Sequence, residues 1–417
     1  MATSSNIESS TAPTSGADGA AAASAPAVGS LLVSLTALPP DGLEAMLTQL
    51  ALAFPESNTR GKILVATPDA GHPILASKSF GSLALLPYTP AVPSMNTLFL
   101  SAADYLNTFR LVEDHQAVAC LLLGADSQSL APEAIRVLAD EVLSSTVDLA
   151  VPRYRLGPRE GLVNSAILYP VTRALYGTRT RFPLAIDLGL SVRMAERLAA
   201  VAQSFTASGQ SDAILWPVAE AAAVNWTISE VEAGTRTLPQ PPSIDLNALL
   251  AQIAGSLFAD INAKASFWQR VRTLQPGRPI SMNTAPADAW PDVTPMLEAF
   301  RLAYSNLAEI WALVLPPNTL LGLKHLSLLP STSFRMSDAL WTRIVYDFIL
   351  AYRLHTINRG HLLGALTPLY LAWVASHIIL AGSGVPPEQH VEEQAVTFES
   401  DKAYLVSRWR WPDRFNP

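Results

Sequence analysis

Residues that could bind an anion are concentrated between positions 147 and 191. An apolar strand pattern, DLAVP, runs into a polar loop, RYRLGPREG, and then into a helical pattern, LVNSAILYPVTRALYG. Loops at strand ends carry binding and catalytic residues more often than strands do. The planar guanidinium groups of Arg153, Arg155 and Arg159 suit a carboxylate or a phosphate, although arginines in such loops are also commonly solvated without a ligand.

Three further polar residues follow within the helical pattern. Asn164, Tyr169 and Arg173 are separated by five and four residues, so they need not share one helical face. Pro170 lies between them and can either begin a second helix or kink the first. We expect the loop and the start of the helix to form the ligand-binding part of the chain.

The segment resembles a known family of enzymes. VPRYR, a short glycine-containing loop with an acidic residue, N-x-x-x-Y-P-x-T-R-A-L-Y-G-x-R-x-R-x-P-L and D-x-G-L-S are similar to motifs of bacterial GT-A-fold glycosyltransferases related to mannosylglycerate and glucosylglycerate synthases. The resemblance extends more faintly over about residues 30–411. It implies transfer of a hexose, with retention at the anomeric carbon, from a nucleotide-diphosphate sugar to a small acceptor, carboxylated like glycerate.

The resemblance also implies roles for single residues. A divalent cation, Mg²⁺ or Mn²⁺, would bridge a protein carboxylate and the diphosphate, and the carboxylate implied here is Asp126. The implied residues are Asp187 and Asp212 for catalysis; Asp69, Gly71, Asp126, Arg179 and Arg181 for the donor; and Arg153, Arg155, Asn164, Tyr169 and Arg173 for the acceptor.

Purely structural roles are open for the same carboxylates. Asp69 can close an Asx-type turn after a strand. Asp126 can cap the helix that begins near Pro132, and Asp187 can serve as a helix N-cap.

The sequence departs from the family pattern at four polar positions. Gly124-Ala125-Asp126 replaces an Asp-x-Asp, VPSMNTL replaces a Gly-Lys-Gly run, Ala185 and Ile186 replace two glycines, and residues 227–242 lack the expected metal-ligand histidine. Losing one charge-stabilising group typically costs on the order of 10²-fold in rate. Two alternatives follow: a catalytically inactive homologue that acts as a binding or assembly partner, or metal-independent transfer with Arg179 and Arg181 meeting the diphosphate.

Composition limits the possible partners and the cellular location. A net charge of −7 argues against nucleic acid, which requires a basic face. Cys120 is the only cysteine, so no disulfide can form within the chain, and its apolar neighbours predict burial. Residues 1–29 lack the features of a signal peptide and are interpreted as a disordered tail of a cytoplasmic protein. The oligomeric state is open, and a homo-oligomer is possible.

The elements that must position the candidate residues alternate at first and then become helical. Strand patterns at 30–38, 61–68 and 117–130, with a helix at 41–54, predict an α/β protein: a GT-A-like doubly wound nucleotide-binding sheet over residues 30–240. A proline-rich link at 239–242 leads into a helical C-terminal domain at 241–417. Its expected helices are 244–271, 291–315, 336–355 and 361–382, and the last is interpreted as a buried core helix rather than a membrane span.

Overall fold

A seven-stranded sheet forms the first half of the protein. The computed structural model describes residues 30–38, 40–55, 61–68, 78–94, 98–239, 245–272 and 291–412. Asp69, Gly71 and the predicted tail at 1–29 therefore lie outside the described residues. The strands are β1 (Leu31–Leu35), β2 (Ile63–Thr67), β3 (Leu83–Pro87), β4 (Ala119–Leu123), β5 (Leu149–Arg155), β6 (Asp187–Ser191) and β7 (Ile228–Thr235).

The sheet is mixed, with the strand order β3-β2-β1-β4-β6-β5-β7. Strand β6 is antiparallel to β4 and β5, and the other pairs are parallel. The register places Asp187, the first residue of β6, opposite Leu123, the last residue of β4. The reversed direction of β6 thus brings its beginning to the edge where β4 ends.

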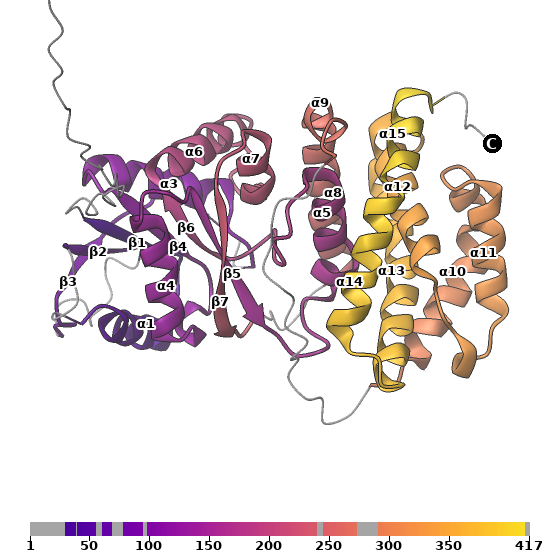
Figure 1. The fold of residues 1–417 in the computed structure, drawn as a ribbon, viewed down its shortest axis with the longest axis horizontal. Coiled ribbons are helices and arrows are strands. Elements are labelled where there is room, and N and C mark those ends of the chain that lie inside the picture. Colours follow the sequence, from indigo (N-terminus) through magenta and orange to yellow (C-terminus); the bar gives the residue numbers. More distant parts are fainter. Residues whose placement is uncertain are drawn as a thin grey trace, which may run out of the picture.

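Helices cover both faces of this sheet (Figure 1). The apolar strands LLVSL, ILVAT and ACLLL are buried throughout, as expected for strands covered on both sides. One face carries α1 (Pro40–Ala53) and α4 (Pro132–Leu143), and the other carries α3 (Ala102–Asp114), α6 (Val192–Ala207) and α7 (Pro217–Ala223). The α/β prediction is confirmed at this level.

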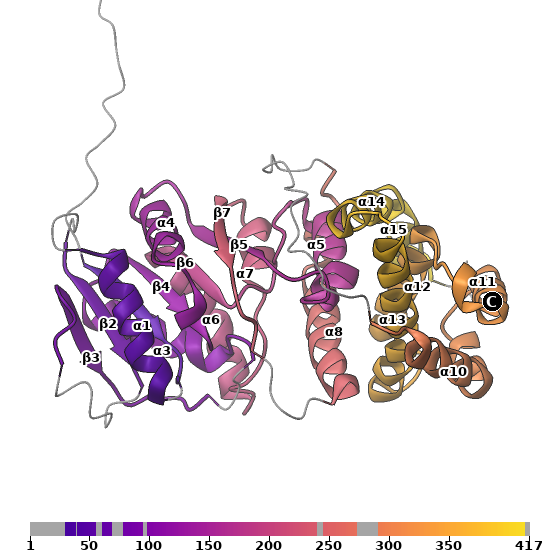
Figure 2. The same ribbon diagram turned by 90° about the horizontal axis from the view of Figure 1, so that it is seen from below.

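The second half is helical and has its own core, in line with the expected helical C-terminal region (Figure 2). Helix α5 (Tyr169–Tyr176) belongs to this core although it precedes β6 and β7 in the sequence. The remaining helices are α8 (Leu246–Ala263), α9 (Ala265–Trp268), α10 (Thr294–Ala312), α11 (Pro317–Leu328), α12 (Asp338–Leu354), α13 (Arg359–Gly382), α14 (Pro387–Ser400) and α15 (Lys402–Arg410).

Helix α13 is long and apolar enough to cross a membrane, but it lies inside the helical half. Its most apolar stretch has a mean hydropathy of 1.6 and is 78% buried within the protein. Trp373 on α13 packs at 6.2 Å from Trp341 of α12, measured between ring centroids. These contacts are those of a core helix.

Local structure differs from the sequence expectation around the central segment. The strand expected at 117–130 ends at Leu123, while β5 continues through the expected loop residues to Arg155. Residues 164–168 form a π-helical turn, and α5 begins at Tyr169 with Pro170 in its first turn. Proline is tolerated there because the first amide groups of a helix have no intrahelical acceptor.

Candidate functional site

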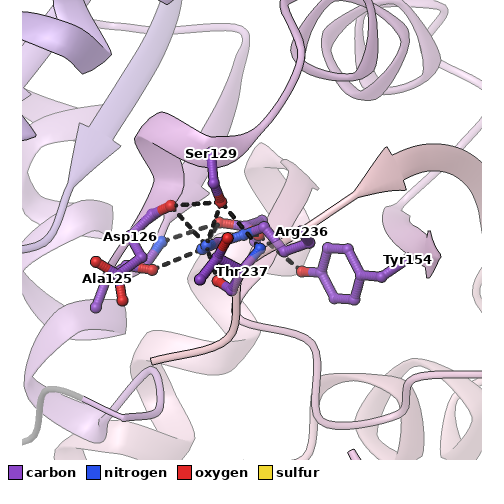
Figure 3. A network of polar contacts seen from close by, with 8 residues as sticks. Ala125, Asp126, Ser129, Tyr154, Arg236 and Thr237 are labelled. Carbon is purple, nitrogen blue, oxygen red and sulfur yellow. Dashed lines mark hydrogen bonds and ion pairs between the residues drawn. The ribbon is translucent and has the colours of Figure 1, made fainter. Parts of the chain in front are cut away.

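The ends of β4, β6 and β7 meet around Asp187, which is completely buried. Figure 3 shows part of this network, with Arg236 between Tyr154 and the loop after β4. Its carboxylate accepts hydrogen bonds from Nε of Arg236 at 2.9 Å, from the Tyr154 hydroxyl at 2.8 Å and from the Gly124 amide at 3.2 Å. Burial and the neighbouring Asp187 raise the pKa of Tyr154 well above its usual value, so the hydroxyl stays protonated and donates. Asp187 is therefore held by three donors away from solvent.

Arg236 supplies the positive charge of this network from just beyond β7. Its Nη2 donates to the Ala125 carbonyl at 2.6 Å, and its Nη1 donates to the carbonyls of Asp126 and Thr237, each at 2.6 Å, and to Oγ of Ser129 at 3.0 Å. A guanidinium has five N–H donors, and these acceptors together with Asp187 use all of them. Arg236 thus joins the loop after β4 to β6 and leaves no donor for a ligand.

The residues around Asp126 do not fit a divalent cation. Asp126 offers one carboxylate, Asp187 is occupied by Arg236, and the guanidinium already places a positive charge at this loop. Among the residues that the structure describes, no group of three or more His, Cys, Asp or Glu side chains could hold a metal. The carboxylate of Asp126 accepts a hydrogen bond from Gln128 at 3.3 Å.

Two of the residues assigned to the acceptor join α5 to α14. Arg173, which is 2% exposed, makes a two-pronged ion pair with Glu399 at 2.8 and 3.1 Å and a second ion pair with Glu392. The Tyr169 hydroxyl donates to Glu392 at 3.0 Å and accepts from Nη1 of Arg173 at 3.0 Å. These side chains link α5 and α14, two helices that are more than 200 residues apart in the sequence.

Three other arginines from the sequence analysis line one polar cavity between the sheet and α14. The cavity has a volume of about 60 Å³ and is bordered by Arg153, Arg155, Arg181 and Glu388. Arg181 pairs with Glu388 at 2.8 and 2.9 Å, and it holds the pKa of that carboxyl below its usual value despite burial. Nη1 of Arg181 is buried and has no hydrogen-bond partner. The volume of the cavity is sufficient for several waters or one small anion.

The remaining predicted residues are spread over different surroundings. Asn164 is buried, and its Nδ2 donates to the Arg181 carbonyl at 2.8 Å, which shapes the cavity wall. Asp212 lies between Ser211 and Ala213, whose carbonyls accept from the first amides of α3. Arg179 is exposed. The structure therefore gathers Arg153, Arg155 and Arg181, and it separates them from the buried Asp187.

His377 of α13 borders the same cavity and gives the protein a predictable response to acid. Its Nδ1 lies 2.7 Å from Nδ1 of His390, and burial, with the nearby His390, lowers the pKa of His377 to about 3. Below a pH of about 6.5, His377 binds a proton in the unfolded chain but stays neutral in the folded chain. Through His377 alone, we expect the free energy of unfolding to fall by up to about 1.4 kcal/mol per pH unit between pH 6 and 4. The carboxyl of Asp347, whose pKa burial raises to about 7, acts in the opposite direction over the same range.

Denaturation of the native chain and of His377→Gln at each pH measures this contribution. The stability of the variant is expected to fall less with decreasing pH than that of the native chain, whereas His361→Gln, at an exposed position on the same helix, follows the native profile. The groups that face His377 are His390, Glu388 and Arg181. Parallel profiles for the native chain and His377→Gln would show that another group titrates.

Arg236, Glu388 and His377 were not among the residues selected from the sequence. Arg236 stands directly after a strand, at the place where a histidine was sought, and a charged residue between a strand end and a proline-rich link is a weak signal. Glu388 and His377 come from the helical half, more than 190 residues after the polar loop. Sequence spacing contains no signal that would pair them with it.

Comparisons with known proteins find likeness only among solved structures. No model of a known protein family matches the sequence, and no curated protein matches it. A crystal structure of a mycobacterial protein is 16% identical, has a TM-score of 0.36, and covers 57% of this chain and 76% of its own. Glucosyl-3-phosphoglycerate synthase from Mycobacterium tuberculosis, in complex with Mn²⁺, UDP-glucose and phosphoglyceric acid, is 15% identical, with a TM-score of 0.36 and coverage of 57% and 80%. Likeness at this level establishes neither family nor function.

Proposed function

We propose that this chain is a GT-A-like protein of the cytoplasm that has lost metal-assisted hexose transfer and acts as a binding or assembly partner. The observation that carries the proposal is the buried Arg236, which neutralises Asp187 and occupies the loop after β4. A metal-assisted transferase needs free carboxylates at that loop to hold the cation that stabilises the departing diphosphate. Here the Asp187 carboxylate of β6 and the backbone carbonyls of Ala125 and Asp126 are already bonded to the Arg236 guanidinium.

The polar motifs of the sequence support descent from a transferase rather than retained chemistry. Tyr169 and Arg173, two of the motif residues, contribute to packing between α5 and α14. Asp187 has no exposed surface with which to approach a sugar hydroxyl. A general base must come within hydrogen-bonding distance of the proton it takes. The positions of these motif residues thus support the proposal that they now stabilise the fold and no longer take part in transfer.

The polar cavity favours a second candidate, metal-independent transfer to a small carboxylated acceptor. Arg153, Arg155 and Arg181 border the cavity, and the unpartnered Nη1 of Arg181 is a donor suited to a carboxylate. This candidate keeps a nucleotide-diphosphate sugar as donor and requires no Mg²⁺ or Mn²⁺. It predicts that a nucleotide binds with the same affinity in the presence and in the absence of a divalent metal ion.

Titration calorimetry of the full-length protein with UDP, GDP and ADP, each with and without Mg²⁺ or Mn²⁺, separates the candidates. We expect no metal-dependent binding and no sugar transfer to glycerate from the matching nucleotide sugars. Metal-dependent binding that Asp126→Ala abolishes, and that the exposed Asp140→Ala leaves intact, would contradict the proposal and indicate a conventional transferase. Tight binding without metal, together with transfer, would establish the second candidate.

A further inference from the structure

An apolar hollow lies between the sheet and α8, beside the Asp187 network. Its volume is about 150 Å³, and its walls include Phe99, Leu184, Ile186, Leu238, Leu249 and Ile253. Ile186 immediately precedes Asp187, and Leu238 follows Arg236 by two residues. The hollow therefore opens beside the strand ends where the sequence predicted a sugar site.

The polar groups that border the hollow are already bonded to the protein. The Tyr154 hydroxyl donates to Asp187 at 2.8 Å, and Nδ2 of Asn164 donates to the Arg181 carbonyl at 2.8 Å. A hexose placed here would lose water from several hydroxyls without gaining hydrogen bonds in return, which is unfavourable. The lining is therefore unfavourable for a sugar and favourable for a group without hydrogen-bonding atoms.

Part of this apolar lining comes from a residue that replaces a glycine of the family pattern. Ile186 stands at this position, and its side chain adds apolar surface where a glycine would leave the backbone open. Leu238 adds apolar surface from the segment after β7. Both residues contribute aliphatic groups to the lining of the same hollow.

Size and lining together indicate the class of ligand. A cavity of about 150 Å³ lined by leucine, isoleucine and phenylalanine is large enough to accept a molecule the size of benzene. We propose that this hollow binds the apolar group of a small ligand, a single aromatic ring or a short alkyl chain. This inference rests on the proposed binding role and gives that role a ligand class.

Titration of the full-length protein with toluene and with n-hexanol tests the inference. We expect saturable binding of one molecule per chain, and about tenfold weaker binding in Leu238→Trp, whose indole fills the hollow. Leu249→Trp on α8 fills it from the other side and serves if the first variant does not fold. Leu52→Trp, at a leucine of α1 that is 59% exposed, is the matched control and is expected to keep the native affinity.

The outcomes separate this inference from the proposed function. Absence of toluene and hexanol binding in the native chain, or equal binding in both hollow-filling variants, would overturn the apolar site. If the nucleotides also fail to bind, that result leaves the loss of metal-assisted transfer intact. Metal-dependent nucleotide binding would overturn the proposed function whatever the apolar probes do. Glucose bound more tightly than toluene, with Leu238→Trp weakening it, would overturn the assigned ligand class.

Discussion

Arg236→Ala is expected to lower the free energy of unfolding by about 3–5 kcal/mol, because it leaves the Asp187 carboxylate buried without its cation. Both side chains of this pair are completely buried, and the guanidinium also satisfies the carbonyls of Ala125 and Asp126. Removal therefore leaves a buried carboxylate and two partly buried carbonyl acceptors without their donors. Urea denaturation followed by circular dichroism measures the loss.

Two comparisons show whether the buried pair is responsible. Lys78→Ala breaks the ion pair with Glu44, in which both side chains are about half exposed, and is expected to cost at most about 1 kcal/mol. The double variant Asp187→Leu/Arg236→Met removes both charges and is expected to be more stable than Arg236→Ala alone. A loss in Arg236→Ala no larger than that in Lys78→Ala would show that the network is not needed for folding.

Arg173→Ala is expected to lower the free energy of unfolding by about 2–4 kcal/mol and to free α14 from α5. Arg173 is 2% exposed, whereas its partners Glu392 and Glu399 are 28% and 20% exposed and can regain part of their hydration. This accessibility makes the expected loss smaller than that for Arg236. Amide hydrogen exchange of residues 387–400 should become faster in the variant than in the native chain.

Arg335→Ala is the matched control, because Arg335 is an exposed arginine of the same helical half. It is expected to change stability by no more than about 0.5 kcal/mol. A double-mutant cycle with Glu399→Gln should give a coupling energy of about 1–3 kcal/mol for the pair. Unchanged exchange of α14 in Arg173→Ala would show that other contacts hold this helix.

The fold class could be read from the sequence because its signals are local. The apolar runs that became β1, β2 and β4 and the long helical patterns in the second half each fall within a single element. The antiparallel direction of β6 has no such local signal, because it depends on the path that α5 takes through the other core. Helix α5 was expected near the sheet, but its apolar face packs with the helical half.

The candidate site could be predicted less well from the sequence, because its residues are paired across distant elements. The sequence marked Asp187 as a reactive carboxylate, but its cation lies 49 residues later, beyond three further elements. The family resemblance implied acceptor binding for Tyr169 and Arg173, and within the structure they contact Glu392 and Glu399, which are separated by two helical turns on α14. A carboxylate pair at that spacing is a signal that could have suggested the ion pairs.

Helix α5 also sets the order in which the protein can acquire its structure during synthesis. All residues of the first core precede position 240, so the sheet can close while the second half is still on the ribosome. Arg173 is made 226 residues before Glu399. At a synthesis rate of roughly 5–20 residues per second, roughly 11–45 s pass between the synthesis of Arg173 and that of Glu399. Throughout that interval the nascent chain presents an apolar helix and an unpaired cation to the cell, which is the kind of surface that chaperones bind.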